Sequence, residues 1–133
     1  MKVLIDSDVL LDVALRRVPF WQASLETLKW AEQSPGRGAV AWHSFSNLQY
    51  LLRGNARAFI SDLLLIVDVP KVDTDALRSA LQFKMTDLED AMQAASAVRF
   101  GANYIITRNI PDYQNSPVVA ILPAEFLNRT AGK

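Results

Sequence analysis

The chain has 133 residues, half of them hydrophobic, and its fourteen acidic residues balance its fourteen basic ones. This length and composition suit one buried core, so we expect a single domain over residues 1–133. Because the chain contains no cysteine, a disulfide scaffold, a cysteine-based zinc site and a cysteine nucleophile are excluded. The charge balance argues against a protein that holds RNA by bulk positive charge alone, although it allows a local basic rim around an acidic pocket.

The N-terminal segment has no long apolar run, because Asp6 directly follows Val3–Ile5. A secretory signal needs a longer run, and a membrane-spanning helix needs about 18–20 apolar residues. We therefore expect no secretory signal and no membrane-spanning helix. Together with the absence of cysteine, this is compatible with a location in the reducing cytoplasm.

Apolar runs in the first half of the sequence predict two strands among helices. The β-branched and leucine run Val3–Ile5 is typical of a buried strand in a parallel sheet. Helices are expected at residues 9–15, from residue 19 to about residue 33, at residues 45–52 and at residues 56–65. A loop at residues 34–38 precedes the second strand at residues 39–42, and Gly54 is an expected helix C-cap.

The second half continues the alternation of strands and helices. Thr86 and Glu89 have the spacing of a capping box, which predicts Thr86 as the N-cap of a helix that Gly101 closes. The other elements are expected at residues 66–70 (a short or edge strand), 74–83 (a helix), 104–107 and 118–121 (strands) and from residue 123 (a short helix). This order predicts a mainly parallel sheet with helices on both faces.

Acidic side chains stand where parallel strands are expected to end. Asp6 directly follows the first strand, and Asn109 and Asp112 follow the strand at residues 104–107. Asp90 lies in the first turn of the capped helix that leads into that strand. Ligands of open α/β sheets bind outside the carboxyl ends of the strands, so these groups converge if the two strands are neighbours.

Carboxylates that share one place repel one another and need a positive charge to neutralise them. Oxygen ligands of this kind suit Mg²⁺ or Mn²⁺. Such ions activate water and stabilise the charge that develops during phosphodiester hydrolysis. A serine–histidine–aspartate site does not compete with this interpretation, because His43 is the only histidine and is expected at the surface or at a strand end.

Most of the acids also have an ordinary structural interpretation. Asp8 and Asp12 suit an acid at a helix N-terminus and a solvated residue. Asp87 and Glu89 suit the cap and the dipole of the helix that follows them, and Asp90 suits another dipole partner. The acid at the end of the first strand is harder to explain in this way.

Three segments together resemble the PIN domain family. Residues 3–12, VLIDSDVLLD, resemble its opening strand and first acids. Residues 87–97, DLEDAMQAASA, resemble its third motif, an aspartate followed by a helix of small residues. Residues 101–113, GANYIITRNIPDY, resemble its closing motif, a strand followed by threonine, arginine and further acids. The three segments occur in the family's order and span nearly the whole chain.

The resemblance implies a three-layer α/β/α sandwich with a mainly parallel sheet of four or five strands. It also implies a Mg²⁺- or Mn²⁺-dependent endoribonuclease, of the VapC-like kind that forms the toxin of a toxin–antitoxin pair. The expected partners are an RNA substrate, a small antitoxin protein and a second copy of the chain in a homodimer. By match to the motifs, Asp6 and Asp90 are the main metal ligands, Asp112 supports them directly or through water, and Asp8 and Asp87 are further supporting residues.

The sequence departs from the family pattern at two positions. Asn47 stands where the family usually carries a glutamate on the helix after the second strand, and Asn109 stands where many members carry a further aspartate. An asparagine can coordinate a cation through its carbonyl oxygen, but it brings no charge. Fewer carboxylates predict weaker Mg²⁺ binding.

Two other functions are compatible with parts of this pattern. The neutral Asn47 and Asn109 favour a PIN-fold module that binds RNA or a protein without cutting. A phosphoacceptor receiver domain also carries acids at strand ends, and Asp6 and Asp8 could be its acid pair. The last strand is followed by Leu122 and a proline, with no lysine, so the receiver interpretation is disfavoured.

Four arginines lie on segments expected near the acids and are candidate contacts to RNA phosphates. They are Arg16, Arg17, Arg53 and Arg108. Solvated surface arginines are the commoner case, and the salt dependence of RNA binding separates the two possibilities.

Overall fold

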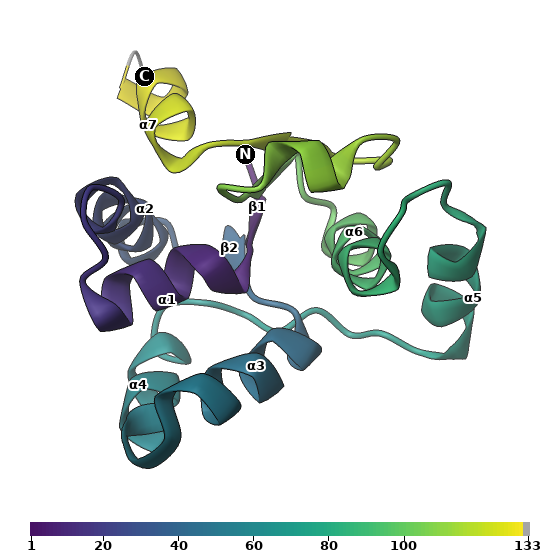
Figure 1. Cartoon of the computed structure of the whole chain (residues 1–133). Helices are drawn as coiled ribbons and strands as arrows, with labels where there is room; N and C mark the ends of the chain where they lie inside the picture. The colour runs from purple at the N-terminus through teal and green to yellow at the C-terminus, as the bar shows by residue number, and fades with distance from the viewer. Residues whose placement is uncertain (132–133) are drawn as a thin grey trace.

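The computed structural model describes residues 1–131, and its centre is a four-stranded parallel sheet (Figure 1). The strands lie in the order β2-β1-β3-β4. They are β1 (Val3–Ile5), β2 (Gly38–Ala39), β3 (Tyr104–Ile106) and β4 (Val119–Ile121). Leu4 pairs with Ala39 on one side and with Ile105 on the other, which confirms that β1 and β3 are neighbours. Since the strands are parallel, their carboxyl ends meet at one edge of the sheet, here called the carboxyl edge.

Helices cover both faces of this sheet. They are α1 (Ser7–Leu15), α2 (Trp21–Gln33), α3 (Trp42–Leu52), α4 (Ala56–Leu63), α5 (Thr74–Gln82), α6 (Leu88–Phe100) and α7 (Pro123–Ala131), with short 3₁₀ turns η1 (Arg53–Asn55) and η2 (Ile110–Tyr113). Figure 1 shows α1 and α2 on one side of the strands and α6 on the other, with α5 packed outside α6. The expected three-layer α/β/α sandwich with a parallel sheet is confirmed. Among residues 1–131, no helix is both long and apolar enough to cross a membrane.

The core has two parts because successive side chains of β1 point to opposite faces. Val3 and Ile5 pack with residues of the first four helices and with Phe126 of α7. Leu4 packs on the other face, against Ala94 of α6 and its neighbours. All three β1 side chains are fully buried, and each such burial stabilises the fold by about 1.5–3 kcal/mol. Packing on both faces therefore holds the strands in place, and with them the residues that follow their carboxyl ends.

The second strand is shorter than the sequence predicts. The strand covers Gly38–Ala39, and α3 begins at Trp42. The predicted strand at residues 39–42 therefore extended too far toward the C-terminus. Ala39, Val40 and Ala41 are buried, as in a strand, whereas Trp42 is exposed, and the Val40 backbone N–H donates to the Asp68 carbonyl. The expected strand at residues 66–70 is reduced to an isolated parallel bridge between Asp68 and Ala39. A Cβ at Gly38 would lie 3.0 Å from the Ala31 side chain, so glycine allows β2 to pack closely on α2.

Two predicted helix ends also differ from the structure. The residue with a positive φ at the end of α3 is Arg53, with φ 50°, and Gly54 lies in the following 3₁₀ turn. The N-cap of α6 is Asp87, whose side chain accepts a hydrogen bond from the Asp90 backbone at 3.1 Å, and not Thr86. The predicted end of α6 is confirmed, because Gly101 adopts φ 76° as its C-cap.

Candidate metal centre at the carboxyl edge

Asp6 is the most densely hydrogen-bonded side chain at the carboxyl edge. It caps α1 and is 8 % exposed. Its Oδ1 accepts from the Ser7 backbone at 2.7 Å and from Gln93 Nε2 at 3.1 Å. Its Oδ2 accepts from Thr107 Oγ1 and from the Tyr113 hydroxyl, each at 2.9 Å. Burial raises the pKa of the Asp6 carboxyl, and the hydrogen bonds from Tyr113, Thr107 and Ser7 partly lower it again.

Asp8 lies one helical position into α1 and points to the chain that follows β3. Its Oδ2 accepts from the Arg108 backbone at 2.9 Å and, at 3.2 Å each, from Thr107 Oγ1 and Asn109 Nδ2. Its Oδ1 is buried and has no hydrogen-bond partner among the described residues. Burial and the neighbouring Asp6 raise the pKa of the Asp8 carboxyl to about 6. Asp8 is thus part of the site and not only an acid at a helix N-terminus.

Asp90 and Asp112 approach the same place from α6 and η2. Burial and, in decreasing order, the charges of Asp87, Asp6, Asp112 and Glu89 together raise the pKa of the half-buried Asp90 carboxyl to about 7. Like charges act on a pKa in this way only when they are close. Asp6 at the end of β1 and Asp112 in η2 thus both act on the charge of Asp90, although within residues 1–131 the three acids form no ready-made ligand cluster, and Asp112 is exposed.

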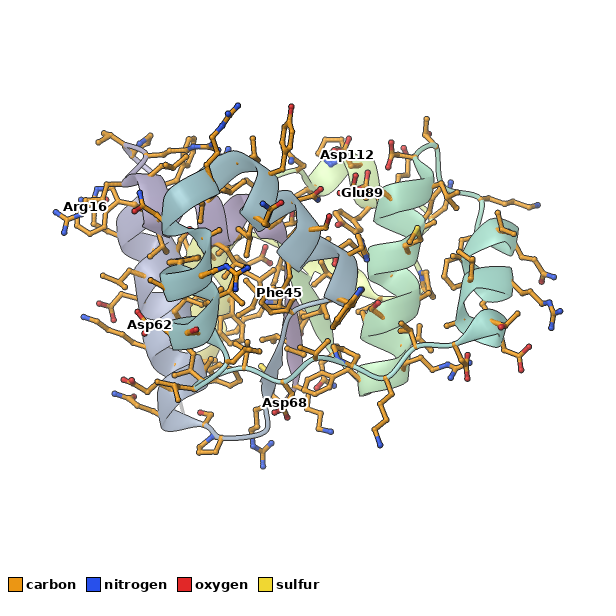
Figure 2. All side chains as sticks on the ribbon, turned by 90° about the horizontal axis from the view of Figure 1, so that it is seen from below. Arg16, Phe45, Asp62, Asp68, Glu89 and Asp112 are labelled. Carbon is orange, nitrogen blue, oxygen red and sulfur yellow. The ribbon has the colours of Figure 1, made fainter. Side chains whose placement is uncertain are left out.

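Glu89 also lies beside this group, although its spacing from Thr86 predicts a role in capping the helix. In Figure 2 the labels of Glu89 and Asp112 fall close together in the view, and the charges of both residues act on Asp90. Glu89 Oε1 accepts a hydrogen bond from Asn47 Nδ2 of α3 at 2.7 Å. The capping-box pattern had given Glu89 another role. A signal against that role was present in the sequence, because Asp87 is itself a good N-cap and leaves Glu89 free.

Asp12 is not the solvated residue that the sequence suggests. It is fully buried, and both of its oxygens accept from the Arg108 guanidinium, from Nη2 at 2.9 Å and from Nε. The Arg108 guanidinium also stacks 4.0 Å from the centre of the Phe20 ring. The bond to Asp12 raises the pKa of Arg108. This buried pair ties α1 to the chain after β3 and so fixes Asp8 against Thr107.

The other three candidate arginines lie at the ends of helices. Arg16 and Arg17 follow α1, where Arg16 lies 5.7 Å from the Trp21 ring and Arg17 lies 3.9 Å from Asp12. Arg53 is exposed at the end of α3. In Figure 2 Arg16 projects on the opposite side of the view from Glu89. The acids are thus brought together by the fold, whereas Arg16 stands apart from them.

The donor chemistry of this group fits a hard divalent cation. The side chains that converge offer carboxylate and amide oxygens, and Asp8 Oδ1 and Gln93 Oε1 are buried without a hydrogen-bond partner in the part of the chain that the structure describes. Within residues 1–131, however, no three acids or histidines are arranged so that they could hold an ion as they stand. Each Asp6 oxygen already accepts two hydrogen bonds, so a cation must displace a protein donor to bind Asp6.

His43 does not join the candidate ligands. It is half-buried at the start of α3, and burial lowers the pKa of its imidazole, which the charges of Glu89 and Asp6 partly raise. Its Nε2 has no hydrogen-bond partner among residues 1–131. It lines the groove between α5 and α6 with apolar residues such as Ala80 and Met92.

A family model described as PIN domain matches residues 2–111. Solved structures share the fold at low sequence identity. VapBC2 from Rickettsia felis, bound to a DNA fragment from its promoter, is 11 % identical over 92 % of this chain and 98 % of that chain, with a TM-score of 0.71. FitAcB from Neisseria gonorrhoeae is 15 % identical over 92 % and 98 %, with a TM-score of 0.62. PAE2754 from Pyrobaculum aerophilum is 16 % identical over 100 % and 97 %, with a TM-score of 0.65. No curated protein matches the sequence significantly.

Proposed function

The chain belongs to the PIN domain family, and on this premise we propose that it is a metal-dependent endoribonuclease that hydrolyses RNA phosphodiester bonds. PIN domains are generally nucleases that depend on a divalent metal. One observation carries the proposal for this chain: acids that follow β1 and β3 face the first turn of α6 at the carboxyl edge, where the charges of Asp6 and Asp112 raise the pKa of Asp90. Carboxylates so close together are unfavourable without a cation, and their chemistry suits Mg²⁺ or Mn²⁺.

In this proposal Asp6, Asp90 and Asp112 hold the ion and are the catalytic acids. Asp8, Asp87, Asn47 and Asn109 support them. A bound divalent ion supplies Lewis-acid stabilisation of the reacting phosphate and lowers the pKa of water. The surrounding side chains orient the proposed ligands.

The hydrogen bonds of the site fix the orientation of Asp6. Gln93 and Thr107 hold its two oxygens from α6 and from the end of β3. The Asp87 cap fixes the first turn of α6 and therefore the place of Asp90. Asp90 binds a proton below about pH 7 in the free protein, and cation binding releases that proton to solvent.

We further propose that the enzyme is the toxin of a toxin–antitoxin pair, silenced by a small antitoxin, and that it forms a homodimer. Support comes from the resemblance of the three motifs to VapC-like proteins and from the shared fold with VapBC2. RNA is contacted in this proposal by Arg16, Arg17 and Arg53. The fourth candidate, Arg108, is held by Asp12 and Phe20 and is assigned a structural role instead. A second subunit would add basic surface that the neutral chain lacks.

A second candidate function is a PIN-fold module that binds RNA or a protein without cutting. It is favoured by the neutral Asn47 and Asn109 and by the four protein donors that already occupy Asp6. Such a module would bind its partner equally well after the metal is removed.

Cleavage of a mixed pool of structured and single-stranded RNA separates the two functions. The purified, partner-free protein is assayed with Mg²⁺, with Mn²⁺ and with EDTA, beside Asp6→Asn, Asp90→Asn and the control Asp75→Asn. Asp75 is an exposed acid of α5 that pairs with Arg78, away from the site. The nuclease proposal expects cutting that needs metal, that Asp75→Asn retains and that both site variants lose. Wild-type rates in either site variant contradict the assignment, and folded protein that does not cut supports the binding module.

A further inference from the structure

The α6 residue Glu89 is free of any capping role. Asp87 is the N-cap, and its Oδ1 accepts from the Asp90 backbone. Glu89 is therefore the second residue of the helix, and its side chain reaches across to α3. There its Oε1 accepts from Asn47 Nδ2 at 2.7 Å, which joins positions 42 residues apart in sequence.

This contact sets the role that Asn47 can have. Its amide nitrogen faces Glu89, so the group that Asn47 presents to the acids is a hydrogen-bond donor. A donor cannot bind a cation. The sequence suggests Asn47 as a ligand through its carbonyl oxygen, whereas the structure shows it holding a carboxylate.

Glu89 lies beside the proposed metal ligand Asp90. The two residues are consecutive in the first turn of α6, and the Glu89 side chain is held toward α3 by Asn47. Gln93, one turn further along α6, is 1 % exposed and donates to Asp6, while its Oε1 has no partner among the described residues. The first two turns of α6 thus carry Glu89, Asp90 and Gln93 toward the carboxyl edge, between Asn47 and Asp6.

We propose that Glu89 is a further carboxylate ligand of the metal centre and that Asn47 is the residue that positions it. The charge that the family usually carries on the helix after the second strand is here supplied from α6. This inference rests on the proposed function, because it assumes that the carboxyl edge binds a divalent cation.

The pair allows an exchange that conserves size and hydrogen bonding. In Glu89→Gln the carboxylate is lost from α6. In the double variant N47D/E89Q the carboxylate stands on α3 and the amide on α6, so donor and acceptor change places and the charge is restored. Glu32→Gln is the matched control, because Glu32 is exposed near the end of α2, beside the loop that leads into the amino end of β2.

The measurement is Mn²⁺ affinity by titration calorimetry on the full-length protein, without RNA. Glu89→Gln is expected to weaken binding about tenfold, the effect of one lost charge in a solvent-accessible site. N47D/E89Q is expected to regain most of that loss, and Glu32→Gln to bind as wild type does. A merely structural hydrogen bond would not produce this recovery of metal affinity.

The outcomes separate this inference from the proposed function. If Glu89→Gln binds Mn²⁺ as tightly as wild type while Asp6→Asn does not bind, the metal centre stands and Glu89 is not part of it. If N47D/E89Q stays as weak as Glu89→Gln although folded, the exchange of roles is contradicted. If folded wild-type protein binds no Mn²⁺, the proposed metal centre and the place of Glu89 in it are both overturned.

Discussion

The Tyr113 hydroxyl donates a hydrogen bond to Asp6 Oδ2 at 2.9 Å. Tyr113 is 5 % exposed, and burial together with the Asp6 charge raises the pKa of its phenol, so the hydroxyl keeps its proton. The other hydrogen bond to Asp6 Oδ2 comes from Thr107. Tyr113 is therefore a protein donor that occupies a position on Asp6 that a cation would use.

Tyr113→Phe tests this competition. Loss of a hydrogen bond to a charged group is expected to lower the free energy of unfolding by about 1.5–3 kcal/mol in EDTA. Because the proposed cation replaces the hydroxyl, the difference from wild type should shrink when Mn²⁺ is present. Urea unfolding of both proteins with and without Mn²⁺ measures it. An equal difference in both conditions would show that the hydroxyl stays on Asp6 when metal is bound.

The raised pKa of Asp90 predicts how stability depends on pH. The folded-state pKa is about 7, above the ordinary aspartate value of 3.8, so the folded state holds the proton more tightly than the unfolded state. Without metal, this group's contribution to stability is present at low pH and is lost as the pH rises from about 4 to about 7. Urea midpoints of wild type and Asp90→Asn in EDTA across that window measure it. Asp90→Asn should show the smaller decline, and parallel profiles would contradict the raised pKa.

The buried pair of Asp12 and Arg108 predicts a large loss of stability. Removing one partner of a buried ion pair costs about 3–5 kcal/mol when the other charge stays buried without compensation. Here Arg17 lies 3.9 Å from Asp12 and the Arg108 side chain is partly exposed, so the lower end of that range is expected. Asp12→Asn and Arg108→Ala should each lower the free energy of unfolding by that order, whereas the exposed Arg53→Ala should leave it nearly unchanged. Denaturant unfolding is the measurement. An Arg108→Ala protein as stable as wild type would contradict a structural role for this pair.

The arginines after α1 are tested by the salt dependence of RNA binding. In an Asp6→Asn background that prevents cutting, we expect Arg16→Ala/Arg17→Ala to weaken binding to single-stranded RNA. Each lost phosphate contact should reduce the slope of log K against log salt by about 0.7. Fluorescence anisotropy over a series of NaCl concentrations measures the slope, with Arg78→Ala as the control. An unchanged slope would remove both arginines from the RNA surface.

The sheet and its helices could be predicted from the sequence because their signals are local. The run Val3–Ile5 is apolar on both faces, which is typical of a strand inside a parallel sheet. Gly101 ends α6 in the left-handed conformation that glycine adopts without strain. The second strand was harder to delimit, because a buried apolar run before a helix has the same pattern whether or not it pairs with β1.

The candidate site could be predicted only where a residue's place follows from an element's end. Asp6 and Asp112 follow strands, so their convergence could be expected. The contact of Asn47 with Glu89 and the burial of Asp12 against Arg108 depend on how helices distant in sequence pack together. No spacing rule encodes such contacts, and Thr86 competed with Asp87 for the same cap with an equally good pattern.

The central claim is that the acids of the carboxyl edge hydrolyse RNA with the help of a divalent metal. The most direct test is analysis of the RNA ends that wild-type and Asp6→Asn proteins produce in Mn²⁺ and in EDTA. Attack by water leaves linear monophosphate ends, whereas attack by the RNA 2′-hydroxyl leaves 2′,3′-cyclic phosphates. We expect wild-type protein to produce linear ends only when metal is present, and Asp6→Asn to produce none. Cyclic ends, cutting in EDTA, or equal cutting by Asp6→Asn would contradict it.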